Sequence, residues 1–432
     1  MAYSGTGSGT AQDPYIITDV DQLNEIRNHN SSHWELGNDI DASDTVNWNG
    51  GEGWVRIGSY TNPFEAHLNG KGFAINNLFA NRLTGGGLFG GLVNSSVVDL
   101  FMNNADITGG SASIFLGSCL SSNISNVHVQ GTVIYNEEFS GGFIGFITGS
   151  EVTDCSANVN IIPTGVTKNF IGVLIGEGYT FSVKRSKASG YIRGNNYCGG
   201  VVGSIDGEVL VEDCYNESEV DCTGVSGGVV GSSYAASSSE VNEIKNCYNT
   251  GLITSGTGAV LGAEYVFPTT NSNNYYDSDL SETTQSAIGE MKTSTEMKTL
   301  STYIPEWDIV DESVYVDETW FIYDGVDYPR LGWEITPEQT NSAGFTLLTT
   351  HEQGDTTLHK VGFSGFTLLE THIDKVEEIE FAALTLREYV PQPDYPSLLF
   401  PNYISNIRVY RNNLKGQQLN IENKINNKIK NI

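Results

Sequence analysis

A short phrase recurs seven times between residues 86 and 262: small residues, then apolar residues, then a closing glycine. Successive closing glycines are 27 to 31 residues apart, at Gly90, Gly117, Gly145, Gly176, Gly203, Gly231 and Gly262. A repeat of this length is typical of a solenoid, in which each unit buries its apolar face only against its neighbours. The repeat therefore constrains the fold more than any other feature of the chain.

A second phrase follows the glycine phrase in five of the repeats. A small or apolar residue stands six positions before a β-branched one, as in Cys155 to Ile161 and Cys214 to Val220. Because six is even, both side chains point to the same face of a strand. The residues between them at even offsets are mostly small, and no helical period competes with this alternation. The pattern predicts an all-β chain, a right-handed parallel β-helix with coils of about 28 residues.

Stacked coils turn equivalent positions into columns, and two columns are predicted. The residue before each interior position belongs to a second column, which should face solvent or a turn. In this second column Arg185 lies between Asp154 and Asp213, which predicts an ionic ladder. Such exposed pairs contribute only ~0–1 kcal/mol, so the ladder supports the register and is not a catalytic site. Leu100 reaches its apolar partner Ile107 after seven residues, which predicts a β-bulge. The predicted interior column is Leu100, Val127, Cys155, Ser186, Cys214 and Cys247.

These repeats resemble the glycine-rich GLUG-repeat family of microbial surface adhesins and of phage and archaeal-virus structural proteins. Upstream, Asp13–Ile17 and Phe64–Gly70 look like the first coils of such proteins, and downstream Tyr275–Asp277 and Asp327–Leu331 look like their closing segment. The resemblance covers roughly residues 8 to 334. It implies the solenoid fold and an extracellular type of architecture, and it transfers no catalytic residues.

The predicted organisation has five parts. A short helix with Asp19 as N-cap and with Leu23 and Ile26 facing inward forms a lid over the first coil. A second short helix is expected at residues 296–300. The parts are an N-terminal cap with the first coils (1–80), the repeat body (81–281), a C-terminal capping segment (282–340), a small β-rich domain (341–410) and a basic tail or short helix (411–432).

Aromatic residues gather in the C-terminal capping segment. They fit either of two roles, stacking against sugar rings or plugging the open end of the last coil, and the plug is the favoured interpretation. The residues are Trp307, Trp320, Tyr328 and Trp333.

A duplicated phrase marks the predicted C-terminal domain. Gly344–His351 recurs 21 residues later as Gly365–His372, which indicates a duplicated strand or hairpin. His351 and His372 occupy equivalent places, so paired metal ligation is conceivable, but a structural role is favoured. The alternative is a meeting of symmetry-related histidines on a trimer axis. The isoleucines of the tail follow a helical stripe, whereas its many asparagines favour a polar tail.

Composition limits the classes of function. The net charge is −30 with 22 basic residues, which argues against nucleic-acid binding by the body. The chain begins with Met1 and shows neither a secretion signal nor an 18-residue apolar run, which favours a virion protein over an adhesin that has lost its signal. The six cysteines lack a C-x-x-C spacing, so we expect no zinc site and buried free thiols.

No sequence motif indicates catalysis. Asp154 and Asp213 lie two coils apart with Arg185 between them, and the Asp39–Asp44 cluster lacks the glycine-kinked loop of a calcium site. We therefore predict no catalytic, cofactor-binding or metal-binding residue and no cofactor. The expected function is a non-enzymatic virion surface protein, such as a tail fibre or capsid appendage. It would be a homotrimer that contacts other virion proteins and binds host glycan, without inserting into a membrane. The alternatives are a cellular surface adhesin and a β-helix polysaccharide lyase or hydrolase.

Overall fold

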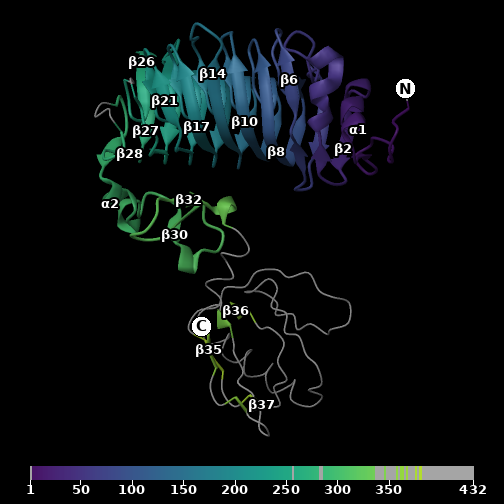
Figure 1. The fold of residues 1–432 in the computed structure, drawn as a ribbon. Coiled ribbons are helices and arrows are strands. Elements are labelled where there is room, and N and C mark those ends of the chain that lie inside the picture. The colour runs from purple at the N-terminus through teal and green to yellow at the C-terminus, as the bar shows by residue number, and fades with distance from the viewer. Residues whose placement is uncertain are drawn as a thin grey trace. The chain divides into compact units, whose positions relative to one another are not determined.

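A computed structural model of the 432-residue chain describes residues 2–254, 257–281 and 286–335, with six short strands between residues 345 and 381. The chain divides into two compact units, Met1–Gly332 and Trp333–Ile432. The first unit is built around a parallel β-helix, in which the strands of each coil pair in parallel with their equivalents in the next coil (Figure 1). The predicted solenoid of strands is confirmed.

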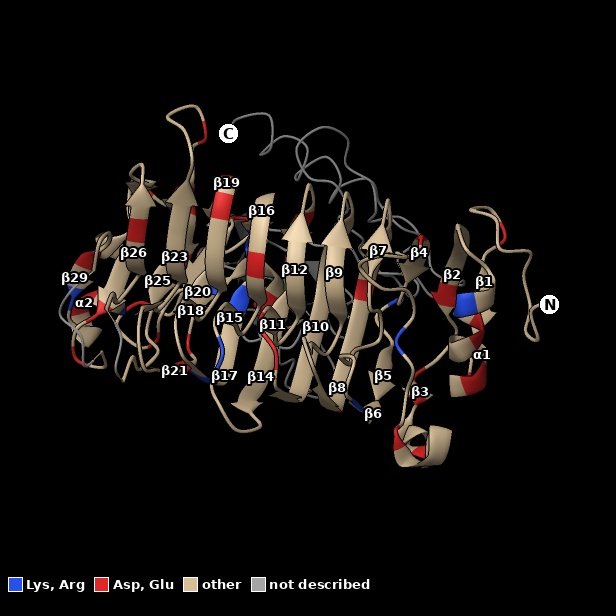
Figure 2. Ribbon diagram, turned by 90° about the horizontal axis from the view of Figure 1, so that it is seen from above, with Lys and Arg blue, Asp and Glu red and all other residues tan. Residues whose placement is uncertain are grey.

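The strands of the β-helix stack into columns, one strand of each coil above the next. Most strands of the first column begin at the last apolar residue of the glycine phrase, one position before the closing glycine. Figure 2 shows its strands side by side. Its members are β7 (Leu92–Val93), β9 (Leu116–Leu120), β12 (Ile144–Thr148), β16 (Ile175–Lys184), β19 (Val202–Glu212), β23 (Val230–Ala235) and β26 (Leu261–Val266).

The second and third columns follow along each coil, and longer strands run from one column into the next. The second contains β4 (Ala66–Asn69), β8 (Ser96–Gly109), β10 (Asn123–Tyr135), β13 (Glu151–Thr153), β24 (Glu243–Lys245), β27 (Thr270–Ser272) and the last residues of β16 and β19. The third contains β5 (Ala74–Asn76), β6 (Phe79–Arg82), the last residues of β8 and β10, β14 (Ser156–Pro163), β17 (Lys187–Gly194), β20 (Tyr215–Asn216), β21 (Glu219–Cys222), β25 (Tyr248–Asn249), β28 (Tyr275–Asp277) and β29 (Glu290–Lys292). A short fourth column contains β11 (Ser140–Gly141), β15 (Ile171–Gly172), β18 (Cys198–Gly199) and β22 (Ser226–Gly227).

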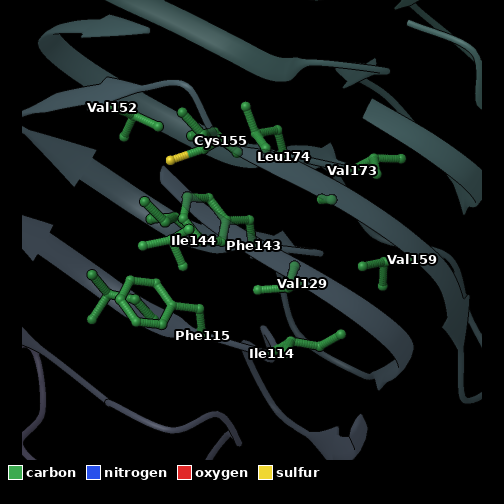
Figure 3. Close-up of a cluster of buried hydrophobic side chains, with 14 of the residues drawn as sticks. Ile114, Phe115, Val129, Phe143, Ile144, Val152, Cys155, Val159, Val173 and Leu174 are labelled. Atoms are coloured by element: carbon green, nitrogen blue, oxygen red, sulfur yellow. The ribbon is translucent and has the colours of Figure 1, made fainter. Parts of the chain in front are cut away.

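The interior is apolar and continuous through the stacked coils. Figure 3 shows Phe115 and Phe143 from neighbouring coils in this interior, together with Cys155. The rings of Phe115 and Phe143 are stacked, with centroids 5.1 Å apart. The structure places all six residues of the predicted interior column here with no exposed surface, and it pairs Leu100 with Val127.

The residue before each interior position forms a turn column. Its members adopt left-handed φ angles between 45° and 56°, a region that asparagine and aspartate tolerate better than most residues. Side chains also join along the column, because Asn126 Nδ2 donates to Asp99 Oδ1 at 2.8 Å. The expectation of a turn at this position therefore has a local cause. The members are Asp99, Asn126, Asp154, Arg185, Asp213, Asn246 and Asn273.

The first coil contains the β-bulge that the seven-residue spacing predicts. Val129 pairs with Met102 but Gly131 pairs with Ala105, so β8 carries one more residue than β10 in this interval. Asn104 lies in the interval with a φ of 54°. The bulge restores the register, and Ile107 again pairs with Val133.

The N-terminal lid is the predicted amphipathic helix. α1 (Val20–Glu25) begins after Asp19, whose Oδ1 accepts from the backbone N–H of Gln22 at 2.8 Å. Leu23 and Ile26 are fully buried, as expected. The lid continues through η1 (Ile26–Asn28), and the first coils contain β1 (Tyr15–Ile17), β2 (Ser32–Leu36), β3 (Ile40–Asp41) and η2 (Ser43–Gly51).

The prediction that all cysteines are free thiols is wrong for two of the six. Cys198 and Cys222 form a disulfide, while Cys119, Cys155, Cys214 and Cys247 are buried free thiols. Cys222 pairs with Gly194 of the previous coil, and a Cβ atom at Gly194 would collide with the sulfur of Cys198. The missing side chain leaves room for the two sulfurs to meet. The bond joins different columns, which the repeat spacing does not reveal.

The C-terminal segment of the first unit packs against the outer face of the last coils. Cys214 and Asn216 point into the interior, so Tyr215 between them points outward. The Trp320 ring lies 5.9 Å from the rings of both Tyr215 and Tyr248. The segment contains α2 (Ser294–Met297), η3 (Leu300–Thr302), β30 (Ile309–Asp311), η4 (Glu312–Val314), β31 (Trp320–Ile322), β32 (Arg330–Leu331) and the start of η5 (Gly332–Glu334).

The second unit contains the duplicated phrase, and its two copies pair with each other. Phe345–Thr346 (β33) is parallel to Phe366–Thr367 (β36). Two further parallel pairs join β34 (Thr357–Leu358) to β37 (Lys375–Val376) and β35 (Val361–Phe363) to β38 (Ile379–Phe381). His351, His372 and residues 411–432 lie outside the described residues.

Candidate functional site

Exposed tyrosines follow one row of the first column, three residues after the closing glycines. Tyr179 on β16 pairs with Asp206 on β19, Asp206 with Tyr234 on β23, and Tyr234 with Tyr265 on β26. Tyr179, Tyr234 and Tyr265 are 45%, 39% and 37% exposed, whereas core aromatics of the same coils are fully buried. Figure 2 shows acidic positions on β16, β19 and β26 within this column. The row therefore presents rings with a carboxylate between them.

A stack of three rings accompanies the row. Phe139, Phe170 and Tyr197 each precede a strand of the fourth column, and successive ring centroids are 5.2 Å and 5.0 Å apart. All three residues have φ angles near 60°, which is a costly conformation for a bulky residue, at about 1–3 kcal/mol each. The edge of Tyr265 meets Tyr197 at 6.1 Å, which connects the stack to the row. Three consecutive coils thus keep the same strained backbone to hold a ring outward.

Polar side chains form a ladder directly beside the stacked rings. Asn169 Nδ2 donates to Glu138 Oε1, and Asn195 Nδ2 donates to Asn169 Oδ1, both at 3.0 Å. The hydroxyl of Thr223 then donates to Asn195 Oδ1 at 2.9 Å. Each step crosses from one coil to the next, so rings and polar groups repeat together. We call this surface the aromatic flank: Phe139, Phe170, Tyr197, Tyr179, Tyr234 and Tyr265 with Glu138, Asn169, Glu177, Asn195, Asp206 and Thr223.

Glu177 is the electrostatically unusual group of the aromatic flank. It points outward from β16, two residues before Tyr179, and is half-buried. Burial raises its pKa to about 7, and the negative charges of Asp206 and Glu138 add to the effect. Burial also raises the pKa of Asp206. The flank therefore holds a carboxyl group that changes charge near neutral pH.

The raised pKa of Glu177 makes the free energy of unfolding depend on pH. The folded state keeps the proton up to about pH 7, whereas the unfolded carboxyl loses it near pH 4.5, so the folded chain loses stability between these values as pH rises. Glu177→Gln cannot ionise, so we expect it to be more stable than the wild type at pH 8, by about 1–2 kcal/mol after a reduction for solvent screening. At pH 4.5 the two proteins should be equally stable. Urea unfolding at both pH values measures this. Glu208→Gln, at an exposed carboxylate of β19, is the control, and a constant difference between wild type and Glu177→Gln would contradict the assignment.

The aromatic flank combines the groups that suit a sugar polymer. Partly exposed rings offer apolar contact to the C–H faces of sugars, and amides, hydroxyls and carboxylates exchange hydrogen bonds with hydroxyl groups. The coil spacing of ~4.8 Å repeats these groups along the surface. Within the part of the chain that the structure describes, no three His, Cys, Asp or Glu side chains are placed to hold a metal ion.

The site residues expected from the sequence lie elsewhere. Arg185 pairs with Asp154 through two hydrogen bonds of 2.7 and 2.9 Å. Asp213 attracts Arg185 but accepts a hydrogen bond from Trp320 Nε1 at 3.1 Å, so the ladder joins the outer packing of the C-terminal segment.

The four C-terminal aromatics are placed differently from one another. Trp307 and Trp320 are buried with centroids 4.8 Å apart, and neither can stack on a sugar. Tyr328 donates its hydroxyl proton to Asp277 Oδ2 at 2.6 Å. Trp333 begins the second unit.

The aromatic flank was not predicted, although its signal is present in the sequence. An aromatic residue stands six positions before the closing glycine in three consecutive repeats, as Phe139, Phe170 and Tyr197. Aligning the repeats on that glycine would have shown both this stack and the row three positions after it. The unequal spacing of the repeats hides these positions when each repeat is read separately.

Comparisons with known proteins identify relatives that are described as a Gly-rich membrane protein, halomucin and immunoglobulin A1 proteases. No family model matches the chain. A Gly-rich membrane protein of Evansella cellulosilytica is 36% identical over 132 residues, and halomucin of Haloquadratum walsbyi is 35% identical over 167 residues. These alignments cover 29% and 36% of this chain but only 15% and 2% of the relatives. An immunoglobulin A1 protease of Streptococcus pneumoniae is 25% identical over 255 residues, which is 56% of this chain and 13% of the relative.

Among solved structures, a protein from Bacteroides ovatus described as an immunoglobulin A1 protease is similar to this chain. The identity is 19% and the TM-score 0.45, with 76% of this chain and 95% of the other covered. Within the described residues, no helix is long and apolar enough to cross a membrane.

Proposed function

We propose that the chain is a non-enzymatic β-helix that is displayed outside the cell and binds glycan along the aromatic flank. The observation that carries the proposal is the strained left-handed backbone of Phe139, Phe170 and Tyr197, which holds a ring outward in three successive coils. Packing the core does not require these rings. Because this unfavourable backbone conformation recurs at equivalent positions of three coils, we infer that the surface it creates has a function.

The charge of the chain favours a neutral polymer as the ligand of the flank. Glu138, Glu177 and Asp206 lie among the rings, and the net charge is −30. Nucleic acids and polyanionic glycans would meet repulsion at this surface. Neutral sugars can donate hydroxyl protons to the carboxylates and avoid that cost.

Two observations support display at a cell surface over the virion position that the sequence favours. The Cys198–Cys222 disulfide fits an oxidising environment outside the cytoplasm. Relatives are described as a Gly-rich membrane protein and as halomucin. A virion appendage, its other virion proteins and the trimer remain predictions from the sequence, which the solution mass of the intact chain by light scattering tests in part.

A glycoside hydrolase is the second candidate function, and Glu177 and Asp206 are the reason. Asp206 lies one coil on and two residues further along the strand, which separates the two Cα atoms by ~8 Å. The paired carboxyl groups of glycosidases lie ~5–9.5 Å apart, which two side chains on the same strand face can span from Cα atoms at this distance, and the acid has a raised pKa. Relatives described as immunoglobulin A1 proteases concern another reaction and are aligned over 11–13% of their length.

Binding and cleavage are separated by one experiment. The intact chain is run by affinity electrophoresis through gels containing mixed-linkage β-glucan, xylan or soluble chitin oligomers. The same mixtures are then assayed for new reducing ends. We expect retardation by at least one polymer without new reducing ends, and at least tenfold weaker binding by Tyr179→Ala/Tyr234→Ala, a loss of about 1.4 kcal/mol or more.

The matched control is Val326→Ala, which removes an exposed apolar side chain (73% exposed) of the C-terminal segment. Equal binding by the double variant and the wild type, or no retardation by any polymer, would overturn the proposal. New reducing ends that disappear in Glu177→Gln would establish the hydrolase instead.

A further inference from the structure

A hollow in the N-terminal lid lies apart from the aromatic flank. Its volume is about 450 Å³, within the range of ~300–1,000 Å³ that small-molecule sites occupy. The side chains that surround it come from the lid helices, from η2 and from the chain that follows η2. They are Asn24, Arg27, Trp48, Asn49 and Val55.

Arg27 supplies a positive charge to this hollow without an ionic partner. Its Nε donates to the carbonyl and the side-chain oxygen of Asn24 at 3.1 and 2.9 Å, and its Nη2 donates to the carbonyl of Val55 at 2.6 Å. Among the described residues no carboxylate pairs with it, and Nη1 makes no hydrogen bond to this part of the chain. Burial lowers the pKa of the guanidinium.

The lack of a partner is unusual in so acidic a chain. The sequence has 52 acidic and 22 basic residues. Of the other arginines that the structure describes, Arg82, Arg185, Arg193 and Arg330 each pair with a carboxylate, and Arg56 does not. The half-buried Arg27 guanidinium therefore keeps N–H donors that can bind the anionic group of a ligand.

Trp48 gives the hollow an apolar wall, and the buried Trp54 lies behind it. The Arg27 guanidinium lies 5.3 Å from the centre of the Trp54 ring, which is fully buried. Trp48 stacks on Trp54 at 5.9 Å with its ring partly exposed to the hollow. Asn49 Nδ2 donates to the carbonyl of Gly53 at 2.8 Å, which leaves its side-chain oxygen available as an acceptor. The hollow thus combines a fixed planar cation, an aromatic face and amides.

We propose that this hollow binds an acidic sugar, a pyranose ring that carries one carboxylate. The guanidinium pairs with the carboxylate through its free donors, the Trp48 ring contacts the C–H face of the sugar, and the amides of Asn24 and Asn49 bind its hydroxyls. A bare inorganic anion would use the arginine but not the tryptophan. A long polyanion would be repelled by the net charge of −30, so a single acidic residue in a mainly neutral glycan fits best.

The test compares acidic sugars with their neutral counterparts on the intact chain. Cellobiouronic acid is compared with cellobiose, and sialyllactose with lactose, by isothermal titration calorimetry and tryptophan fluorescence, with sodium phosphate as a third probe. We expect one acidic sugar to bind at least tenfold more tightly than its neutral partner and than phosphate, with a lower affinity at higher salt. The sugar that binds distinguishes a hexuronic acid from a sialic acid.

Variants assign the binding to the hollow. Arg27→Gln should weaken binding of the acidic sugar at least tenfold, and Arg27→Lys should weaken it less, because a lysine keeps the charge without the planar donors. Trp48→Ala keeps the Val55 contact of Arg27, so it tests the hollow even if Arg27→Gln does not fold. Arg82→Gln, which removes an arginine paired with Glu52, is the control.

Three results would overturn the inference: equal affinity for acidic and neutral sugars, equal binding by Trp48→Ala and the wild type, or a preference for phosphate. The hollow shares no residue with the aromatic flank, so the Tyr179→Ala/Tyr234→Ala variant should bind the acidic sugar normally. Failure of this inference is therefore distinct from failure of the proposed function.

Discussion

Cys214→Asp is expected to prevent folding of the β-helix at neutral pH. Cys214 has no exposed surface, and its thiol donates to the carbonyl of Glu212 at 3.2 Å. Its neighbours along the interior column are Ser186 and Cys247. Cys247 is itself a buried thiol, and burial raises its pKa. A carboxylate at this position would be buried without a cation, at a cost of several kcal/mol or more. Circular dichroism and urea unfolding measure the loss.

Two variants control for the position and the volume of the change. Cys214→Ser should fold, because Ser186 occupies the equivalent place in the previous coil and donates to the carbonyl of Lys184 at 2.8 Å. Asp213→Asn, one residue earlier in the turn column, should cost less than about 1 kcal/mol, since the amide oxygen can still accept from Trp320 and asparagine occupies three equivalent turns. Similar stability of Cys214→Asp and Asp213→Asn would contradict the register of the coils.

The parts of the fold that follow from local alternation were predictable from the sequence. The even spacing from Cys155 to Ile161 fixes which side chains point inward, because strand geometry has a period of two. The odd spacing from Leu100 to Ile107 likewise predicted the β-bulge. The turn column was expected one residue before the interior column, and its left-handed φ angles explain the choice of aspartate and asparagine there.

Contacts between different columns were not predictable in the same way. The Cys198–Cys222 disulfide depends on the absence of a side chain at Gly194, and Trp320 reaches Asp213 across 107 residues. The repeat spacing predicts which residues stack from coil to coil. It does not predict where a loop or the C-terminal segment packs on the outer surface of the coils. The hollow around Arg27 was missed for the same reason, since it brings together residues of different phrases. The outward tyrosines of the aromatic flank were missed because the unequal repeat spacing hides their common distance from the closing glycines.

Buried asparagines show a further limit of the repeat pattern. The interior position after Cys214 is Asn216, a polar residue where the pattern expects small or apolar ones. Its Nδ2 donates to Asn249 Oδ1 in the next coil at 2.7 Å, and its own oxygen accepts from the backbone N–H of Ser218 at 2.9 Å. The amide is satisfied within the column, so it needs no solvent.

Trp320→Ala is expected to release the C-terminal segment from the outer face of the coils. The Trp320 ring is fully buried and lies between the rings of Trp307, Tyr215 and Tyr248. Its removal leaves a cavity among these rings and takes the Nε1–H donor from the half-buried Asp213, whose pKa burial already raises. Truncation of a buried tryptophan costs about 3–5 kcal/mol, and the loss of the hydrogen bond adds to it.

Limited proteolysis and urea unfolding distinguish release of the C-terminal segment alone from unfolding of the segment together with the last coils. Since the segment packs on the outside and the coils keep their own interior, we expect cleavage within residues 294–332 at concentrations of denaturant that leave the coils folded. Val326→Ala, which truncates a side chain of the same segment that is 73% exposed, should behave like the wild type. If Trp320→Ala resists proteolysis as the wild type does, the aromatic packing does not hold the segment. A single unfolding transition at lower denaturant would instead show that the segment and the last coils unfold as one cooperative unit.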